Sequence, residues 1–224
     1  MFLGHFAVGL AAKRAVPGVS LGVLFVGAQL ADLIWPNLVL AGIEKVEVSP
    51  GITAVTPLDF VHYPWSHSLA LLWLWGALFA AVVLLLRPPL PVRRGATAAT
   101  LALVVASHWV LDWISHRPDM PLGLSDERRF GLGLWQSRPW TLFVELGLLA
   151  IGAAIYARST RARNRRGGLG LVALLAILAA IYLASFFGPP PPSATVVAIS
   201  AELLWLFVLL GWWVDRHREP RRAT

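Results

Sequence analysis

The segment that decides the fold class is residues 68–86, SLALLWLWGALFAAVVLLL, which contains no charged side chain. About 20 consecutive apolar residues suffice for a helix to cross a bilayer, so this segment predicts a transmembrane helix. Five further segments of similar character follow the same rule: residues 18–43, 96–115, 139–157, 168–187 and 195–214. A shorter segment, residues 2–12, predicts a half-span or a re-entrant helix. Pro36 predicts a kink in the first of the long spans.

The composition supports the same class of protein. The chain has 224 residues, of which 57% are hydrophobic and 14% charged, whereas soluble domains average about 45–50% and about 25%. We therefore expect a single all-α domain over residues 1–224: a polytopic membrane helix bundle of about six full spans plus a short N-terminal half-span. The absence of cysteine excludes disulfides and thiolate metal sites.

The basic residues predict the orientation of this bundle. The net charge is +7, but arginines lie in short patches between apolar segments rather than along one face, so we expect no nucleic-acid partner. Fourteen of the nineteen Lys and Arg residues lie in three loops and the C-terminal tail, around residues 13–14, 87–94, 158–166 and 216–222. Along the chain these segments alternate with the loops that contain few basic residues. By the positive-inside rule the basic segments are cytoplasmic, as is the C-terminus, and the loops at 44–67 and 116–138 face outward. A multi-pass protein of a bacterial-type inner membrane is expected.

The most informative motif is SHWVLDWISH at residues 107–116. His108, Asp112 and His116 are spaced by four, so on a helix they form one stripe. Imidazole and carboxylate donors suit Zn²⁺ or another divalent metal, and ionisable groups inside spans usually face the bundle interior. We therefore expect all three as metal ligands. The alternative is a hydrogen-bonded polar seam without a metal.

A second motif, HYPWSHS at residues 62–68, precedes the span that opens this section. It lies on the same side of the predicted membrane as the first motif, so we expect His62 and His67 as further ligands. The alternative is an interfacial loop in which Ser66 or Ser68 caps the next helix and Trp65 lies at the membrane surface.

Two further ligands are expected from the N-terminal segments. The predicted spans contain no Lys or Arg, and a buried carboxylate without a cation is either protonated or destabilising. Asp32 therefore needs a metal or a histidine as its partner. His5, between Gly4 and Gly9, is expected to join the same site.

Three other acids have less specific expectations. Glu145 and Glu202 lie inside spans and are expected to orient ligating histidines, as carboxylates commonly do. Asp119 is either a turn residue or an outer ligand. His217, in the basic tail, is expected to be solvated.

The ordered set of motifs resembles the YdjM-like inner-membrane metal-dependent hydrolases. The family pattern is a His in the first segment, an Asp in the second, H-x₄-H-S before the third and H-x₃-D in the fourth. The matching residues are His5, Asp32, His62, His67 with Ser68, and His108 with Asp112. Two positions depart from the pattern: Leu33 and Ile34 stand where the family often has a second acid, and Ser66 replaces the usual Thr. The set is more remotely similar to the all-helical zinc phospholipase C and P1 nuclease group, whose members bind several zinc ions.

The resulting hypothesis is a membrane-embedded metal-dependent hydrolase whose site opens toward the extracytoplasmic face. Asp112 and Asp32 are the candidate catalytic residues, which would orient or deprotonate water, and a phosphoester, on a lipid or not, is the substrate suggested by the resemblance. The alternative function is a proton or metal-ion transporter that uses the same His/Asp series. The scarcity of polar residues at the predicted cytoplasmic ends of the spans argues against a path through the membrane. A third possibility is a scaffold whose polar core binds no metal.

Overall fold

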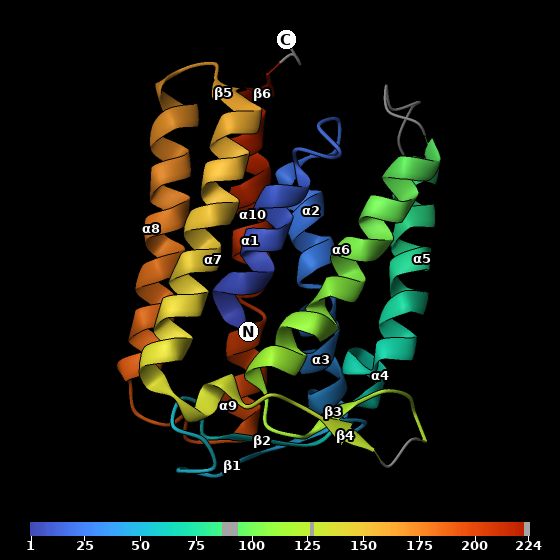
Figure 1. Ribbon diagram of the computed structural model, residues 1–224, viewed down its shortest axis with the longest axis vertical. Coiled ribbons are helices and arrows are strands. Elements are labelled where there is room, and N and C mark those ends of the chain that lie inside the picture. The colour runs from blue at the N-terminus through green and yellow to red at the C-terminus, as the bar shows by residue number, and fades with distance from the viewer. Residues whose placement is uncertain (87–93, 126–127, 222–224) are drawn as a thin grey trace.

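The computed structural model describes residues 1–86, 94–125 and 128–221, and shows long helices lying side by side (Figure 1). The helices are α1 (Phe2–Ala12), α2 (Leu21–Ala28), α3 (Leu30–Leu40), α4 (Pro64–His67), α5 (Leu69–Leu86), α6 (Arg94–Ser115), α7 (Arg138–Ser159), α8 (Arg165–Phe187), α9 (Ala194–Ala201), α10 (Leu204–Arg216) and the 3₁₀ turn η1 (Leu134–Gln136). The expected all-α membrane bundle is confirmed. Parts of the expected loops at 87–94 and 116–138, and of the basic tail, lie outside the described residues.

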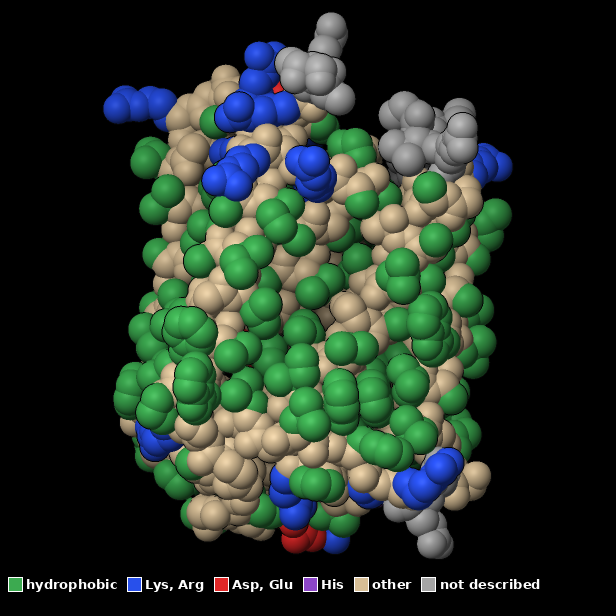
Figure 2. Space-filling model, in the orientation of Figure 1, with side chains coloured by type: hydrophobic (Ala, Val, Ile, Leu, Met, Phe, Trp, Pro, Cys, Tyr) green, Lys and Arg blue, Asp and Glu red, His purple; other side chains and the backbone are tan. Residues whose placement is uncertain are grey.

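Among the described residues, five helical segments are long and apolar enough to cross a membrane: α5, α6, α7, α8, and α9 with α10 taken together over Ala194–Arg216. The bent pair α2–α3 makes a sixth if it is one span. Helix α1 is the expected shorter apolar helix. Apolar side chains cover the middle of the molecule, and Lys and Arg gather toward its two ends (Figure 2). This distribution is the one that a surface in contact with lipid requires, because hydrocarbon cannot solvate charged side chains.

The break in the span predicted at residues 18–43 does not lie where the sequence predicts it. Helices α2 and α3 meet at an angle of 55°, and the residue between them is Gln29, whose backbone leaves the helical region (φ −103°, ψ 9°). Pro36 lies inside α3. The break lets the Ala28 carbonyl accept a hydrogen bond from His108 Nδ1 at 2.9 Å, so it joins the second span to the fourth.

Short strands close the two ends of the bundle. At one end, β1 (Lys45–Val48) pairs with β2 (Leu58–His62) and β3 (Met120–Pro121) with β4 (Arg129–Phe130), both antiparallel. We call this end the hairpin face. At the other end, β5 (Thr160–Ala162) pairs with β6 (Arg218–Pro220) near the C-terminus (Figure 1). We call this end the basic face.

Small residues allow the helices that carry the candidate site to approach closely. A Cβ atom on Gly152 of α7 would lie 2.5 Å from the backbone oxygen of Ala7 in α1, and one on Gly76 of α5 would lie 2.9 Å from that of Ala102 in α6. Close backbone approach at small residues is a common way to pack helices in membranes. These two contacts fix α1 and α6, which carry His5 and the central motif.

A buried ionic network holds the basic face together, and the sequence did not predict it. Lys13 Nζ lies 2.7 Å from Asp215 Oδ2 and donates to the Val19 carbonyl at 2.8 Å. Asp215 also accepts from the Tyr156 hydroxyl at 2.7 Å and from the Leu21 backbone at 3.2 Å. The network therefore ties α10 to α7 and to the segment between α1 and α2.

Candidate metal site

The candidate site is built where four helices converge near the hairpin face. Helix α3 supplies Asp32, α4 supplies His67, and α6 supplies His108 and Asp112 on consecutive turns; we call these four residues the donor quartet. Helix α1 adds His5 beside them. His5, His67, His108 and Asp112 are at most 3% exposed, so the expected convergence of side chains from separate spans is observed.

The imidazole nitrogens of the quartet lie at distances from its carboxylate oxygens that suit neighbouring metal ligands. His67 Nε2 lies 3.4 Å from Asp32 Oδ1 and 3.9 Å from Asp112 Oδ2. His108 Nε2 lies 3.8 Å from Asp32 Oδ1 and 3.1 Å from Asp112 Oδ2. Bonds of about 2.0–2.1 Å to zinc place neighbouring tetrahedral donors about 3.4 Å apart, and the four distances lie on both sides of that value. The buried His and Asp groups are therefore positioned to hold a metal ion.

The hydrogen bonds of His108 leave one nitrogen for such an ion. Its Nδ1 donates to the Ala28 carbonyl at 2.9 Å, which requires the proton on Nδ1 and leaves a lone pair on Nε2. Among the described residues Nε2 makes no hydrogen bond, although it is fully buried. A buried nitrogen of this kind needs a partner, and a metal bound by the quartet would supply it.

His5 lies at the edge of the quartet. Its ring stacks on that of His108 with a centroid distance of 3.7 Å, and its Nε2 lies 3.1 Å from Asp112 Oδ1. Its Nδ1 has no partner among the described residues. Two groups of three residues have metal-ligand spacing, one of His67, His108 and Asp112 and the other of His5, Asp32 and His108, so the two groups share His108. Because His108 offers only Nε2, two ions held by these groups could not both be ligated by that ring.

Asp112 is surrounded by donors. Besides the three histidines it contacts the amino group of Met1. Glu145 accepts hydrogen bonds from the backbone of Phe2 at 2.9 Å and of Gly4 at 3.0 Å, so it caps α1 by satisfying N–H groups that have no partner within the helix. The sequence predicted that Glu145 orients a histidine; instead it fixes the helix that carries His5.

The quartet is open to the surroundings at one residue. The Asp32 side chain is 30% exposed, against 0–3% for the other three. A molecule that reaches the site therefore meets Asp32 first.

Two expected ligands lie outside both groups. His62 is an exposed residue of β2. His116 is buried, but its Nδ1 lies 2.9 Å from Asp119 Oδ1, and the Tyr63 hydroxyl donates to the same carboxylate oxygen at 2.9 Å. Arg117 Nε lies 3.2 Å from the other oxygen of Asp119. His116 and Asp119 thus belong to a polar network that braces the hairpin face.

Glu202, the other acid expected beside a histidine, accepts from Asn37 Nδ2 at 2.9 Å. Asn37 lies on α3 and Glu202 follows α9, so this pair joins those helices. His217 lies at the basic face, where its Nδ1 contacts the Trp213 carbonyl at 2.9 Å.

The structure buries two polar residues that the sequence analysis did not single out, Glu44 and Gln29. Glu44 is 2% exposed and binds Ser66, which in turn contacts His67. Gln29, at the break before α3, is fully buried, and neither atom of its amide group has a partner among the described residues. An acid in a loop and a glutamine in an apolar segment carry no periodic signal, so only their burial identifies them.

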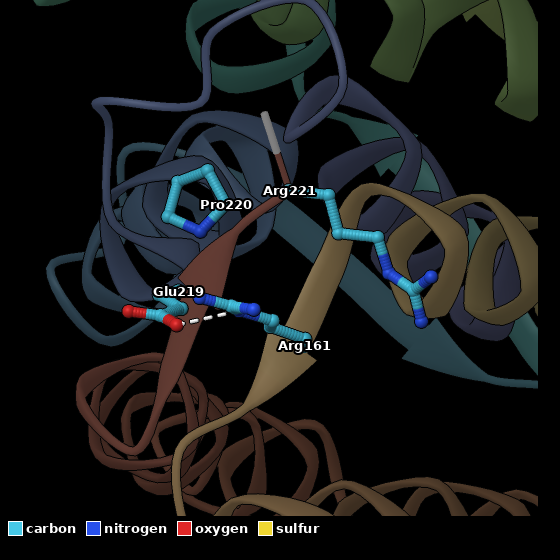
Figure 3. Close-up of a pocket in the computed structure, with 4 residues that line it drawn as sticks. All are labelled: Arg161, Glu219, Pro220 and Arg221. Atoms are coloured by element: carbon cyan, nitrogen blue, oxygen red, sulfur yellow. Dashed lines mark hydrogen bonds and ion pairs between the residues drawn. The ribbon is translucent and has the colours of Figure 1, made fainter. Parts of the chain in front are cut away.

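A surface pocket at the basic face is separate from this site. It is lined by Arg161, Glu219, Pro220 and Arg221 around the β5–β6 pair, and Arg161 donates to Glu219 at 2.6 Å (Figure 3). It contains none of the quartet residues and lies at the opposite end of the bundle from α4 (Figure 1).

Comparison of the chain with protein-family models, with curated proteins and with solved structures gives no significant match.

Proposed function

We propose that this protein is a membrane-embedded metal-dependent hydrolase that binds Zn²⁺ or another divalent ion at His67, His108 and Asp112, with Asp32 beside the ion. The observation that supports this proposal most strongly is the buried triad of His67, His108 and Asp112, which has metal-ligand spacing, with Asp32 Oδ1 3.4 Å from His67 Nε2 and 3.8 Å from His108 Nε2. Burial of two carboxylates in an apolar bundle is costly without a cation. The Met1 amino group contacts Asp112, and a metal ion would supply the further positive charge that a second buried carboxylate needs.

In this proposal the residues of the site have different roles in hydrolysis. A bound divalent ion supplies Lewis-acid polarisation and a lowered pKa of water. Three protein ligands would leave a fourth position on the ion for water, as in catalytic zinc sites. Asp32, which is partly exposed, would face the incoming substrate and accept the proton of that water, a role that requires a carboxylate within hydrogen-bond reach. Asp112 is held by His5 and His108 and keeps the quartet in place.

A phosphoester, free or on a lipid, is the proposed substrate class. Its oxygens are hard donors that bind divalent metals, and the resemblance to the zinc phospholipase C group points the same way. Access at membrane depth through Asp32 is compatible with a lipid substrate delivered by the bilayer.

The proposed setting is a bacterial-type inner membrane with the hairpin face outside and the C-terminus in the cytoplasm. The inner membrane is what the family resemblance implies. The orientation follows from the distribution of Lys and Arg, which are concentrated in the loops and tail of the basic face. The site would then open toward the extracytoplasmic side.

The test is hydrolysis by detergent-purified protein, stripped with a chelator and reloaded with Zn²⁺, Mn²⁺ or Mg²⁺. The substrates are a soluble aryl phosphate and phosphatidic acid in mixed micelles. We expect metal-dependent turnover that Asp32→Asn lowers by about 10²–10⁴-fold, the usual contribution of a general base, and that His62→Ala, at an exposed histidine, leaves unchanged. Metal binding without turnover on either substrate, together with uptake of the metal or of protons into proteoliposomes, would favour the transporter instead.

A further inference from the structure

A buried chain of hydrogen bonds runs from Glu44 through Ser66 to His67. The Ser66 hydroxyl lies 2.6 Å from Glu44 Oε2 and 2.6 Å from His67 Nδ1. The Ser66 backbone N–H donates to Glu44 Oε1 at 2.9 Å. All three side chains are at most 3% exposed, so these short contacts are not exchanged with bulk water.

The direction of this chain follows from the chemistry of its members. An ionised carboxylate only accepts hydrogen bonds, so the single hydroxyl hydrogen of Ser66 is directed to Glu44. The Ser66 oxygen must then accept a hydrogen bond from His67, which places the proton of the ring on Nδ1. The lone pair of His67 is left on Nε2, the atom that lies 3.4 Å from Asp32 and 3.9 Å from Asp112.

The charge of Glu44 supports the same reading. Among the described residues, its hydrogen-bond partners are the N–H and O–H groups of Ser66, both neutral. A buried carboxylate with neutral donors lacks a compensating positive charge. A cation bound at His67 Nε2 would provide it through the polarised hydrogen-bond chain, as in the carboxylate–histidine–metal arrangements that tune ligand basicity.

We propose that Glu44 is a positioning residue which, through Ser66, holds His67 in the tautomer and orientation that bind the metal ion. This inference rests on the proposed metal site and names the residue outside the quartet on which the affinity of that site depends. Glu44 touches neither the ion nor the substrate.

Glu44→Gln is the decisive variant because it reverses the direction of the hydrogen bonds from Glu44 through Ser66 to His67 while preserving the shape of the side chain. The amide nitrogen of glutamine donates to the Ser66 oxygen, so the hydroxyl hydrogen turns toward His67 Nδ1. The ring proton then moves to Nε2, which can no longer act as a ligand. Ser66→Ala removes the connection, and Ser66→Thr retains the hydroxyl.

The metal-binding experiment is a Co²⁺ titration of detergent-purified, metal-stripped protein, followed by visible absorption. We expect Glu44→Gln and Ser66→Ala to weaken binding by about 10–100-fold, the usual loss for an outer partner of a ligand. The double variant Glu44→Gln/Ser66→Ala should bind Co²⁺ no more weakly than either single variant. Ser66→Thr should bind Co²⁺ as tightly as wild type. The matched control is Glu47→Gln, an exposed acid that pairs with Lys45 in the same hairpin.

A second measurement separates this inference from the proposed function. In metal-free protein with ¹⁵N-labelled histidine, we expect the His67 resonances of the Nδ1–H tautomer in wild type and of the Nε2–H tautomer in Glu44→Gln. Wild-type Co²⁺ affinity or an unchanged tautomer in Glu44→Gln overturns the positioning role even if the metal site stands. Conversely, a tautomer change in a protein that binds no Co²⁺ overturns the metal site alone.

Discussion

Replacement of His108 by alanine tests the donor quartet against the stripe that the sequence predicts. His108 and His116 are eight residues apart, on one predicted helical stripe; in the structure both are buried, but His116 lies just after the end of α6. The sequence makes them equivalent ligands. In the structure only His108 belongs to the quartet, whereas His116 pairs with Asp119.

The expected loss of affinity can be bounded from the geometry. His108→Ala removes one of the four donor atoms of the quartet, and with it two of its four close approaches between imidazole and carboxylate, those to Asp32 and Asp112. Loss of an outer partner of a ligand costs about 10–100-fold in metal affinity, so loss of the ligand itself should exceed about 100-fold, or about 2.8 kcal/mol. His116→Ala should change the affinity by less than about threefold, since its nearest polar partners are Asp119 and Tyr63.

The assay is zinc competition against a chromophoric chelator, with total metal measured by mass spectrometry after desalting. Both variants lose a buried imidazole ring, so thermal unfolding of the metal-free proteins controls for damage to the fold. Equal metal affinity in His108→Ala and wild type would refute the role of the quartet in metal binding. A loss in His116→Ala as large as that in His108→Ala would show that the stripe, and not the quartet, binds the ion.

Three further predictions concern the rest of the molecule. Asp215→Asn should destabilise the protein by about 3–5 kcal/mol because it leaves the Lys13 ammonium buried without its counter-charge; thermal unfolding should show partial recovery in the double variant with Lys13→Met, and equal loss in both would contradict the pairing. Burial, reinforced by the nearby Asp119 carboxylate, raises the pKa of Tyr63, so folding stability should fall as the pH rises above about 10, the pKa of the unfolded state. Tyr63→Phe should flatten that decline in denaturation curves measured from pH 8 to 11.5, and an unchanged slope would argue against the buried phenol. Because the chain lacks cysteine, single cysteines at Ser125 and Arg163 report topology: an impermeant maleimide applied to intact cells should label the first and not the second, and the reverse result inverts the proposed orientation.

Much of the architecture was predictable because lipid imposes a simple rule on sequence. Long uncharged segments such as residues 68–86 must be helical to satisfy their backbone groups in a bilayer, and their positions agree with the observed helices. The same rule made Asp32, His108 and Asp112 conspicuous, since ionisable side chains inside spans are rare and usually face the interior. Their convergence with His67 and His5 followed the expectation.

The failures share a physical cause, which is that a one-dimensional pattern does not specify partners. The position of Pro36 suggested the kink, but the break occurs at Gln29, where the freed Ala28 carbonyl binds His108. Glu145 looked like a partner for a histidine, yet the unsatisfied N–H groups at the start of α1 bind it. These outcomes depend on which helices are neighbours.

By itself the sequence determined that this protein belongs in a lipid bilayer, where its helical spans lie, and which ionisable side chains its interior contains. It could do so because hydropathy and the scarcity of intramembrane charge are properties of single segments. Tertiary structure decided which donors share a site. Asp112, on α6, and His116, just after the end of that helix, are four residues apart but bind different neighbours. Glu44, in a loop far along the chain from the central motif, is brought against Ser66. Metal coordination depends on distances of a few ångströms between separate helices, and only the packing of those helices sets them.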